Sequence, residues 1–177
     1  MSAELTTDQK GAIAETAIIH AAVKLGIGVY KPVVEGGRYD LIFDLGDELV
    51  RVQCKWAPLR GDVIAVRCYS TRRSPAGFVR ACYTSREVDA LAAYCPELDR
   101  CYFLRLDALR ATTTIQLRVA AARNGQRAHV NWAEQFEFAA TLGRTVGAIA
   151  QLGERLDGIQ KVAGSSPAGS IEEVTHV

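Results

Sequence analysis

Two strand-forming runs separated by only three residues most constrain how this chain can fold. Residues 39–45 and 49–56 are rich in branched and aromatic side chains, and the glycine that follows the first run suits a tight connection. The pattern predicts an antiparallel hairpin. Because successive side chains of a strand point to opposite faces, Gln53 and Lys55 should share one face, and the hairpin should bring Asp40 beside them.

Asp40, Gln53 and Lys55 have the chemistry of a metal-assisted phosphodiester site. Asp40 offers a carboxylate, Gln53 a carbonyl oxygen and Lys55 a positive charge, and Glu15 on a predicted preceding helix adds a second carboxylate. Oxygen ligands of this kind suit a hard divalent cation, which can act on a phosphodiester together with a bound water. Each residue alone also has a structural explanation, such as a turn-capping Asp40 or a Lys55 that extends to solvent. Their order and spacing together favour the site.

The rest of the chain has the pattern of a small α/β domain. A helix is predicted over residues 7–25, where apolar residues recur at helical spacing, and Gly26 is placed to end it. Further strands are predicted at 27–33, 63–69, 101–106 and 112–119, helices at 86–93 and about 132–142, and a loop at 70–78. These elements predict one domain over residues 1–142, with a central mixed β-sheet flanked by helices.

The order Glu15, Asp40, Gln53 and Lys55 resembles the signature of the PD-(D/E)xK nuclease superfamily. Three further runs, at 97–104, 117–126 and 130–137, resemble the branch of endonucleases associated with group I introns, and the likeness covers roughly residues 7–140. The resemblance implies the restriction-endonuclease-like core of that superfamily, with the element order αβββαβ. The chain departs from the signature at Tyr39, where the signature has proline, and at Gln53, where it has an acid.

The resemblance also implies that Glu15, Asp40, Gln53 and Lys55 are catalytic. Asp40 is expected to be the central ligand of Mg²⁺, for which Mn²⁺ can substitute, and Glu15, Gln53 and the Cys54 backbone carbonyl are expected to complete the ligand set. Lys55 is expected to position the attacking water and to stabilise charge on the phosphate. Because an amide offers only a neutral oxygen, Gln53 should weaken metal affinity unless Glu15 or the Cys54 carbonyl compensates.

Basic residues concentrate in the middle of the chain. The net charge is only +1, yet residues 51–86 hold eight basic residues and a single acid, Asp62. A basic middle suits a phosphate backbone, although basic side chains also protect exposed strand edges from aggregation. The residues predicted to contact DNA are Arg60, Arg67, Arg72, Arg73, Arg80, Arg118, Arg123 and Arg127.

The resemblance implies a Mg²⁺-dependent enzyme that cuts double-stranded DNA at a specific site, as homing endonucleases do. A double-strand break needs two active sites, so a homodimer or homotetramer is expected. Two alternatives stay open. One is a structure-specific nuclease similar to Holliday-junction resolvases, which share a similar core. The other is a DNA-binding remnant of a mobile element that no longer cuts. Gln53 suggests this alternative, because it replaces the acid of the signature.

The C-terminal tail, residues 143–177, differs in composition from the domain. Residues 164–170 consist of glycine, serine, proline and alanine, which predicts partial disorder. Residues 147–170 resemble the conceptual translation of a transfer-RNA gene, so the tail either overlaps such a gene or is an evolved flexible segment. No apolar run is long enough to span a bilayer, and the N-terminus lacks the pattern of a signal peptide. A cytoplasmic protein without a membrane partner is therefore expected.

Overall fold

The computed structural model describes residues 4–34, 36–75, 77–108, 113–121 and 129–143. Helix α1 (Thr7–Lys24) begins at a capping box, in which the Thr6 hydroxyl accepts from the Gln9 N–H at 3.2 Å and the Gln9 side chain accepts from the Thr6 N–H at 2.9 Å. The chain leaves the helix through Gly26, whose φ of +79° is left-handed and costs glycine little. The predicted helix and its end are confirmed. Among the described residues no helix is long and apolar enough to cross a membrane.

A five-stranded mixed sheet forms the centre of the domain. Its strands follow the order β1-β2-β3-β8-β9, in which only β3 and β8 run parallel. The predicted hairpin is β2 and β3, with Leu41 opposite Val52 and Asp44 opposite Leu49. The bounds are β1 (Gly28–Tyr30), β2 (Leu41–Asp44), β3 (Leu49–Trp56), β8 (Ala90–Cys95) and β9 (Arg100–Arg105).

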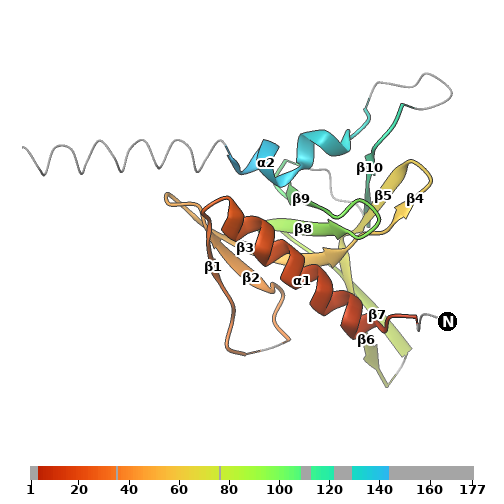
Figure 1. Cartoon of the computed structure of the whole chain (residues 1–177). Helices are drawn as coiled ribbons and strands as arrows, with labels where there is room; N and C mark the ends of the chain where they lie inside the picture. The colour runs from red at the N-terminus through yellow and green to blue at the C-terminus, as the bar shows by residue number, and fades with distance from the viewer. Residues whose placement is uncertain (1–3, 35, 76, 109–112, 122–128, 144–177) are drawn as a thin grey trace, which may run out of the picture.

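The remaining elements form two smaller sheets and a short helical segment. One sheet is three-stranded and antiparallel, in the order β10-β5-β4, and the other is the two-stranded hairpin β6–β7. The bounds are β4 (Leu59–Arg60), β5 (Val63–Arg67), β6 (Tyr69–Ser74), β7 (Gly77–Cys82), β10 (Thr114–Arg118), the 3₁₀ helix η1 (Ala133–Phe136) and α2 (Phe138–Thr141). Figure 1 shows α1 crossing the central sheet and the β6–β7 hairpin projecting away from the body of the domain.

The central sheet is covered differently on its two faces. On one face Ile18 of α1 and Phe138 of α2 pack against Phe43 and Phe103, whose rings stack with centroids 6.0 Å apart. On the other face Leu91 and Leu104 join a second core with side chains of β5, β10 and η1. A mixed sheet flanked by helices is therefore confirmed, with both helices on the same face and a small sheet on the opposite face.

Two local predictions are wrong. Residues 86–93 do not form a helix, because Ala90, Leu91, Ala92 and Ala93 belong to β8 and are fully buried. A strand covered on both faces is apolar throughout, so its sequence lacks the alternation that marks a strand. The αβββαβ order expects a helix between the third strand and the next strand of the central sheet. The structure instead has four strands, β4 to β7, between β3 and β8.

The predicted loop at 70–78 is the second error, since it forms most of the β6–β7 hairpin. The predicted last helix is divided into η1 and α2. Residues 144–177 lie outside the described residues, and with them nearly all of the tail for which disorder and an overlapping transfer-RNA gene were predicted.

Candidate active site

Asp40 lies immediately before β2, and its carboxylate faces the middle of β3. Its N–H donates to the Val52 carbonyl at 2.9 Å, which extends the pairing of the hairpin by one residue. Its Oδ2 accepts from the Cys54 N–H at 2.8 Å and from the Gln53 side-chain amide. The hairpin therefore brings Asp40 and Gln53 into direct contact, at the end of β2 remote from its turn.

The Asp40 carboxylate is held in a position that suits a cation. Burial raises its pKa above the ordinary value, and the negative charge of Glu15 adds to this effect. The Cys54 N–H, the Lys55 charge and the Gln53 amide act in the opposite direction. A cation bound beside Asp40 would offset both the burial and the repulsion from Glu15.

Lys55 is a partly buried lysine whose charge the fold disfavours. Its Nζ donates to the Tyr83 hydroxyl at 2.7 Å and to the Tyr69 carbonyl at 3.3 Å. The ammonium also lies 4.5 Å from the centroid of the Tyr83 ring, within the range of a cation–π contact. Burial lowers the pKa of Lys55 to about 8, against the opposing attraction of Asp40.

Glu15 borders the site from α1 without touching Asp40 through a hydrogen bond. Its carboxylate pairs with Lys31 at 2.6 Å, and its side chain is 22% exposed. Its charge still acts on the pKa of Asp40 and on that of the Cys54 thiol. The Cys54 backbone carbonyl, predicted as a metal ligand, accepts a long hydrogen bond of 3.4 Å from the Gln53 amide.

The structure adds Arg38, which the sequence did not indicate. Its guanidinium donates to the Ser70 hydroxyl at 2.8 Å and to the Cys82 carbonyl at 2.7 Å, and it pairs with Glu87 at 3.0 Å. It also lies 4.5 Å from the centroid of the Tyr83 ring. Arg38 therefore fastens the root of the β6–β7 hairpin to the segment that carries the candidate site.

No sequence signal indicated Arg38 or Tyr83 as part of the site. Arg38 stands two residues before Asp40, but both residues lie outside β2, so strand alternation does not relate them. Tyr83 directly follows β7. Its contact with Lys55 depends on how the β6–β7 hairpin returns to the sheet, and the sequence does not specify that path.

The arginines predicted to contact DNA lie mostly on the smaller sheets. Four of those with described side chains are exposed, and Arg118 on β10 is half-buried. Arg72 is on β6, while Arg123 and Arg127 lie outside the described residues. The four exposed residues are Arg60 on β4, Arg67 on β5, Arg73 on β6 and Arg80 on β7.

The candidate metal ligands around Asp40, namely the side chains of Glu15 and Gln53 and the Cys54 carbonyl, all offer oxygen atoms. Within the described ranges, no three His, Cys, Asp or Glu side chains lie close enough to hold a metal ion together. Mg²⁺ needs fewer protein ligands, because it is usually bound by one or two carboxylates together with waters and substrate phosphates. Asp40 and Glu15, supplemented by the carbonyl oxygens of Gln53 and Cys54, fit that requirement. The Gln53 amide has to rotate, since its nitrogen is the atom that faces Asp40.

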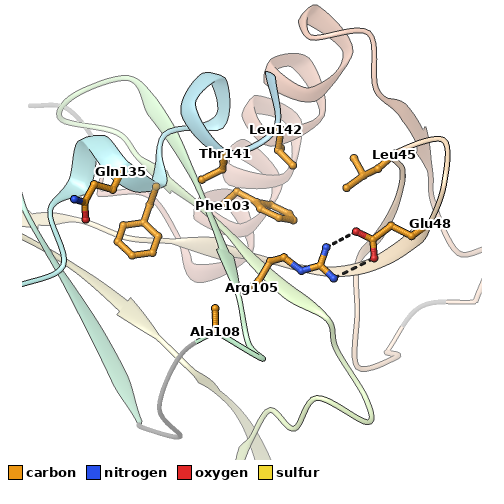
Figure 2. Close-up of a pocket in the computed structure, with 9 residues that line it drawn as sticks. Leu45, Glu48, Phe103, Arg105, Ala108, Gln135, Thr141 and Leu142 are labelled. Atoms are coloured by element: carbon orange, nitrogen blue, oxygen red, sulfur yellow. Dashed lines mark hydrogen bonds and ion pairs between the residues drawn. The ribbon is translucent and has the colours of Figure 1, made fainter. Parts of the chain in front are cut away.

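A cavity of about 300 Å³ lies at the opposite end of the sheet. Figure 2 shows the paired side chains of Glu48 and Arg105 on one side of it and the apolar side chains of Leu45, Phe103 and Leu142 around them. None of the four candidate catalytic residues lines this cavity. The cavity is therefore separate from the candidate active site.

Comparison with known proteins identifies a matching family model and a similar solved structure. Residues 5–139 match the family model of the PD-(D/E)XK endonucleases. The solved structure of a bacterial homing endonuclease, I-Ssp6803I, is similar with a TM-score of 0.63 at 28% sequence identity, over 83% of this chain and 99% of that chain. No curated protein is significantly similar to the chain. The family match spans every candidate catalytic residue.

Proposed function

Because this chain belongs to the PD-(D/E)XK endonuclease family, we propose that it is a metal-dependent endonuclease that cuts double-stranded DNA at a specific site, as a homing enzyme does. The observation that carries the proposal is the meeting of Asp40, Gln53 and Lys55 at one end of the β2–β3 hairpin, with the charge of Glu15 acting on Asp40. The homing role is supported by the similar solved structure, which is a homing endonuclease matched over 99% of its length.

Mg²⁺, with Mn²⁺ as a substitute, is the proposed cofactor. Asp40 and Glu15 would hold it through carboxylates, and Gln53 and Cys54 through carbonyl oxygens. A cation bound there supplies positive charge that offsets the charge developing on the scissile phosphate. The Glu15 carboxylate pairs with Lys31 at 2.6 Å, so a cation bound at Glu15 would compete with that ion pair.

Lys55 is proposed to act as a cation beside the scissile phosphate. With a pKa of about 8, the ammonium form predominates at neutral pH. A general base would need the opposite, deprotonated form. Lys55 therefore orients the attacking water through its remaining N–H donor, while Tyr83 and Tyr69 hold the other two, and its positive charge stabilises the phosphate.

Tyr83→Phe is expected to lower the cleavage rate by roughly tenfold, because a hydrogen bond to a charged group contributes ~1.5–3 kcal/mol. DNA affinity should stay unchanged. The lost acceptor had stabilised the ammonium, so the decline of activity, expected in the wild type above pH 8, should move to lower pH. Single-turnover rates measured across this range check the prediction. Tyr69→Phe is the matched control, since Tyr69 contacts Lys55 through its backbone carbonyl and phenylalanine keeps both that carbonyl and the ring. An equal effect in both variants would contradict the assigned role.

The proposed substrate is duplex DNA bound by the exposed arginines of β4 to β7, Arg60, Arg67, Arg73 and Arg80. A homodimer or homotetramer is proposed because cutting both strands requires two copies of the site.

Cleavage of a randomised duplex library tests the proposed function. The full chain is incubated with Mg²⁺, and the new ends are sequenced. The proposal requires a shared sequence around the cuts in both strands. Preferential cutting of a synthetic four-way junction over linear duplex would instead indicate a structure-specific nuclease.

A non-cleaving DNA-binding remnant is the second candidate, and Gln53 is the observation that favours it. The amide donates to Asp40 where the family signature has an acid, and Glu15 is occupied by Lys31. For an active enzyme, Gln53→Glu should lower the Mg²⁺ concentration required for half-maximal cleavage by roughly tenfold, because it adds a charged ligand. Cleavage that appears only in Gln53→Glu would identify the wild-type chain as a remnant. The metal dependence of plasmid nicking by both proteins separates these outcomes.

A further inference from the structure

One face of the β6–β7 hairpin is almost entirely exposed. The pairing places Thr71 opposite Arg80 and Arg73 opposite Phe78. Since directly paired residues point to the same side of a two-stranded ribbon, these four share a face. Arg80 also lies 5.3 Å from the centroid of the Tyr69 ring, as expected for residues on one face. We call the exposed residues Thr71, Arg73, Phe78, Arg80 and Cys82 the reading face.

Phe78 is the conspicuous residue of the reading face. Its side chain is 78% exposed, and the neighbouring Val79 is 40% exposed on the opposite face. An exposed aromatic residue on a projecting strand pair promotes aggregation unless a partner covers it. The hairpin contains three arginines and no acid over residues 69–82. That charge opposes pairing with a second copy of the hairpin and favours a polyanion.

The root of the hairpin is fixed at the candidate active site. The Tyr69 carbonyl and the Tyr83 hydroxyl both accept from Lys55, and Arg38 binds Ser70 and the Cys82 carbonyl. Figure 1 shows the two strands extending outward from that root. At ~3.4 Å per residue, Phe78, which pairs with Arg73, lies ~14 Å along the hairpin from Tyr69. Along duplex DNA this length corresponds to about four base pairs.

We infer that the hairpin enters the major groove and that Phe78 reads a thymine methyl group about four base pairs from the cut. The major groove admits a two-stranded β-ribbon, and the thymine methyl is the one apolar group on its floor. Arg73 and Arg80 flank Phe78 and supply contacts to guanine edges or phosphates. The inference rests on the proposed function for the position of the cut. Its test depends on binding and does not require cleavage.

The test compares binding preferences selected from a randomised duplex library. Every protein carries Asp40→Asn so that bound duplex is not cut. With Phe78 present, the selected sequences should contain a thymine about four base pairs from the centre of the candidate site. Replacing that thymine by uracil removes only the methyl group and should weaken binding roughly fivefold. Phe78→Ala should lose the preference at that position and become insensitive to the uracil substitution.

Leu49→Ala is the matched control. Leu49 is a large apolar residue at the start of β3, is 64% exposed and lies outside the β6–β7 hairpin. This variant should retain the preference and the sensitivity to uracil. An unchanged preference in Phe78→Ala would overturn the inference, and so would the absence of any DNA binding. If Phe78→Ala changed the mass of the assembly but kept the DNA preference, the inference would also be overturned. Phe78 would then be assigned to a contact between copies of the chain. Binding with the expected preference but without wild-type cleavage would leave the inference standing and reject the proposed nuclease activity.

Discussion

Asp40→Asn is expected to reduce single-turnover DNA cleavage by at least ~10²–10³-fold, the range seen when one preorganised electrostatic group is removed from an active site. The substitution removes the negative charge while leaving a side-chain oxygen that can accept from the Cys54 N–H. The hairpin should therefore fold as before. The variant should bind DNA with unchanged affinity in the absence of divalent metal, and cleavage should not recover at high Mg²⁺ concentration.

Asp44→Asn provides the control at the other end of β2. Asp44 accepts from the Gly46 N–H at 2.9 Å, within the turn of the hairpin, and asparagine keeps that acceptor. Its cleavage rate should match that of the wild type. Equal losses in both variants would show that the Asp40 effect comes from a disturbed hairpin and not from a lost ligand.

Lys55→Met is expected to reduce cleavage by about 10²–10³-fold while leaving the protein at least as stable at pH 7. Methionine is similar in length to the lysine stem and carries no charge. Because burial lowers the pKa of Lys55 to about 8, the folded protein holds the proton less tightly than the unfolded chain does. Removing the ammonium therefore removes a group that opposes folding at neutral pH.

The stability difference between the wild type and Lys55→Met should depend on pH. Between about pH 8 and the ordinary lysine value of 10.5, the unfolded chain binds more protons at residue 55 than the folded protein does. The wild type should gain stability relative to Lys55→Met as the pH rises through this interval. Urea unfolding of both proteins at pH 7 and pH 9.5 measures the difference. A strong loss of stability in Lys55→Met at pH 7 would contradict the assigned electrostatics.

Local rules predicted the parts of the site that lie close together in the sequence. The alternation of β2 and β3 and their short connection are enough to place Asp40 beside Gln53. Helix α1 is equally local, since its apolar residues recur at helical spacing and Gly26 ends it. What these elements have in common is that neighbours along the chain determine them.

The parts that could not be predicted depend on contacts between distant segments. The sequence of β8 is alanine-rich and apolar, and only its burial between two layers makes it a strand. In the β6–β7 hairpin, Phe78, Val79 and Arg80 of β7 are all exposed, so apolar and polar residues do not alternate between a buried and an exposed face. The partners of Lys55 come from the ends of that hairpin, and the pairing of Glu15 with Lys31 joins a helix to the chain beyond β1.

Locating the metal would test the proposed active site most directly. Crystals of the protein with a duplex that it has selected, grown with Mn²⁺, allow the ion to be identified by its anomalous scattering. We expect an anomalous peak bonded to the Asp40 carboxylate and the Cys54 carbonyl, with the Gln53 amide rotated to present its oxygen and a phosphate oxygen beside Lys55. A peak that avoids Asp40, or a scissile phosphate that lies out of reach of Lys55, would contradict the proposed site.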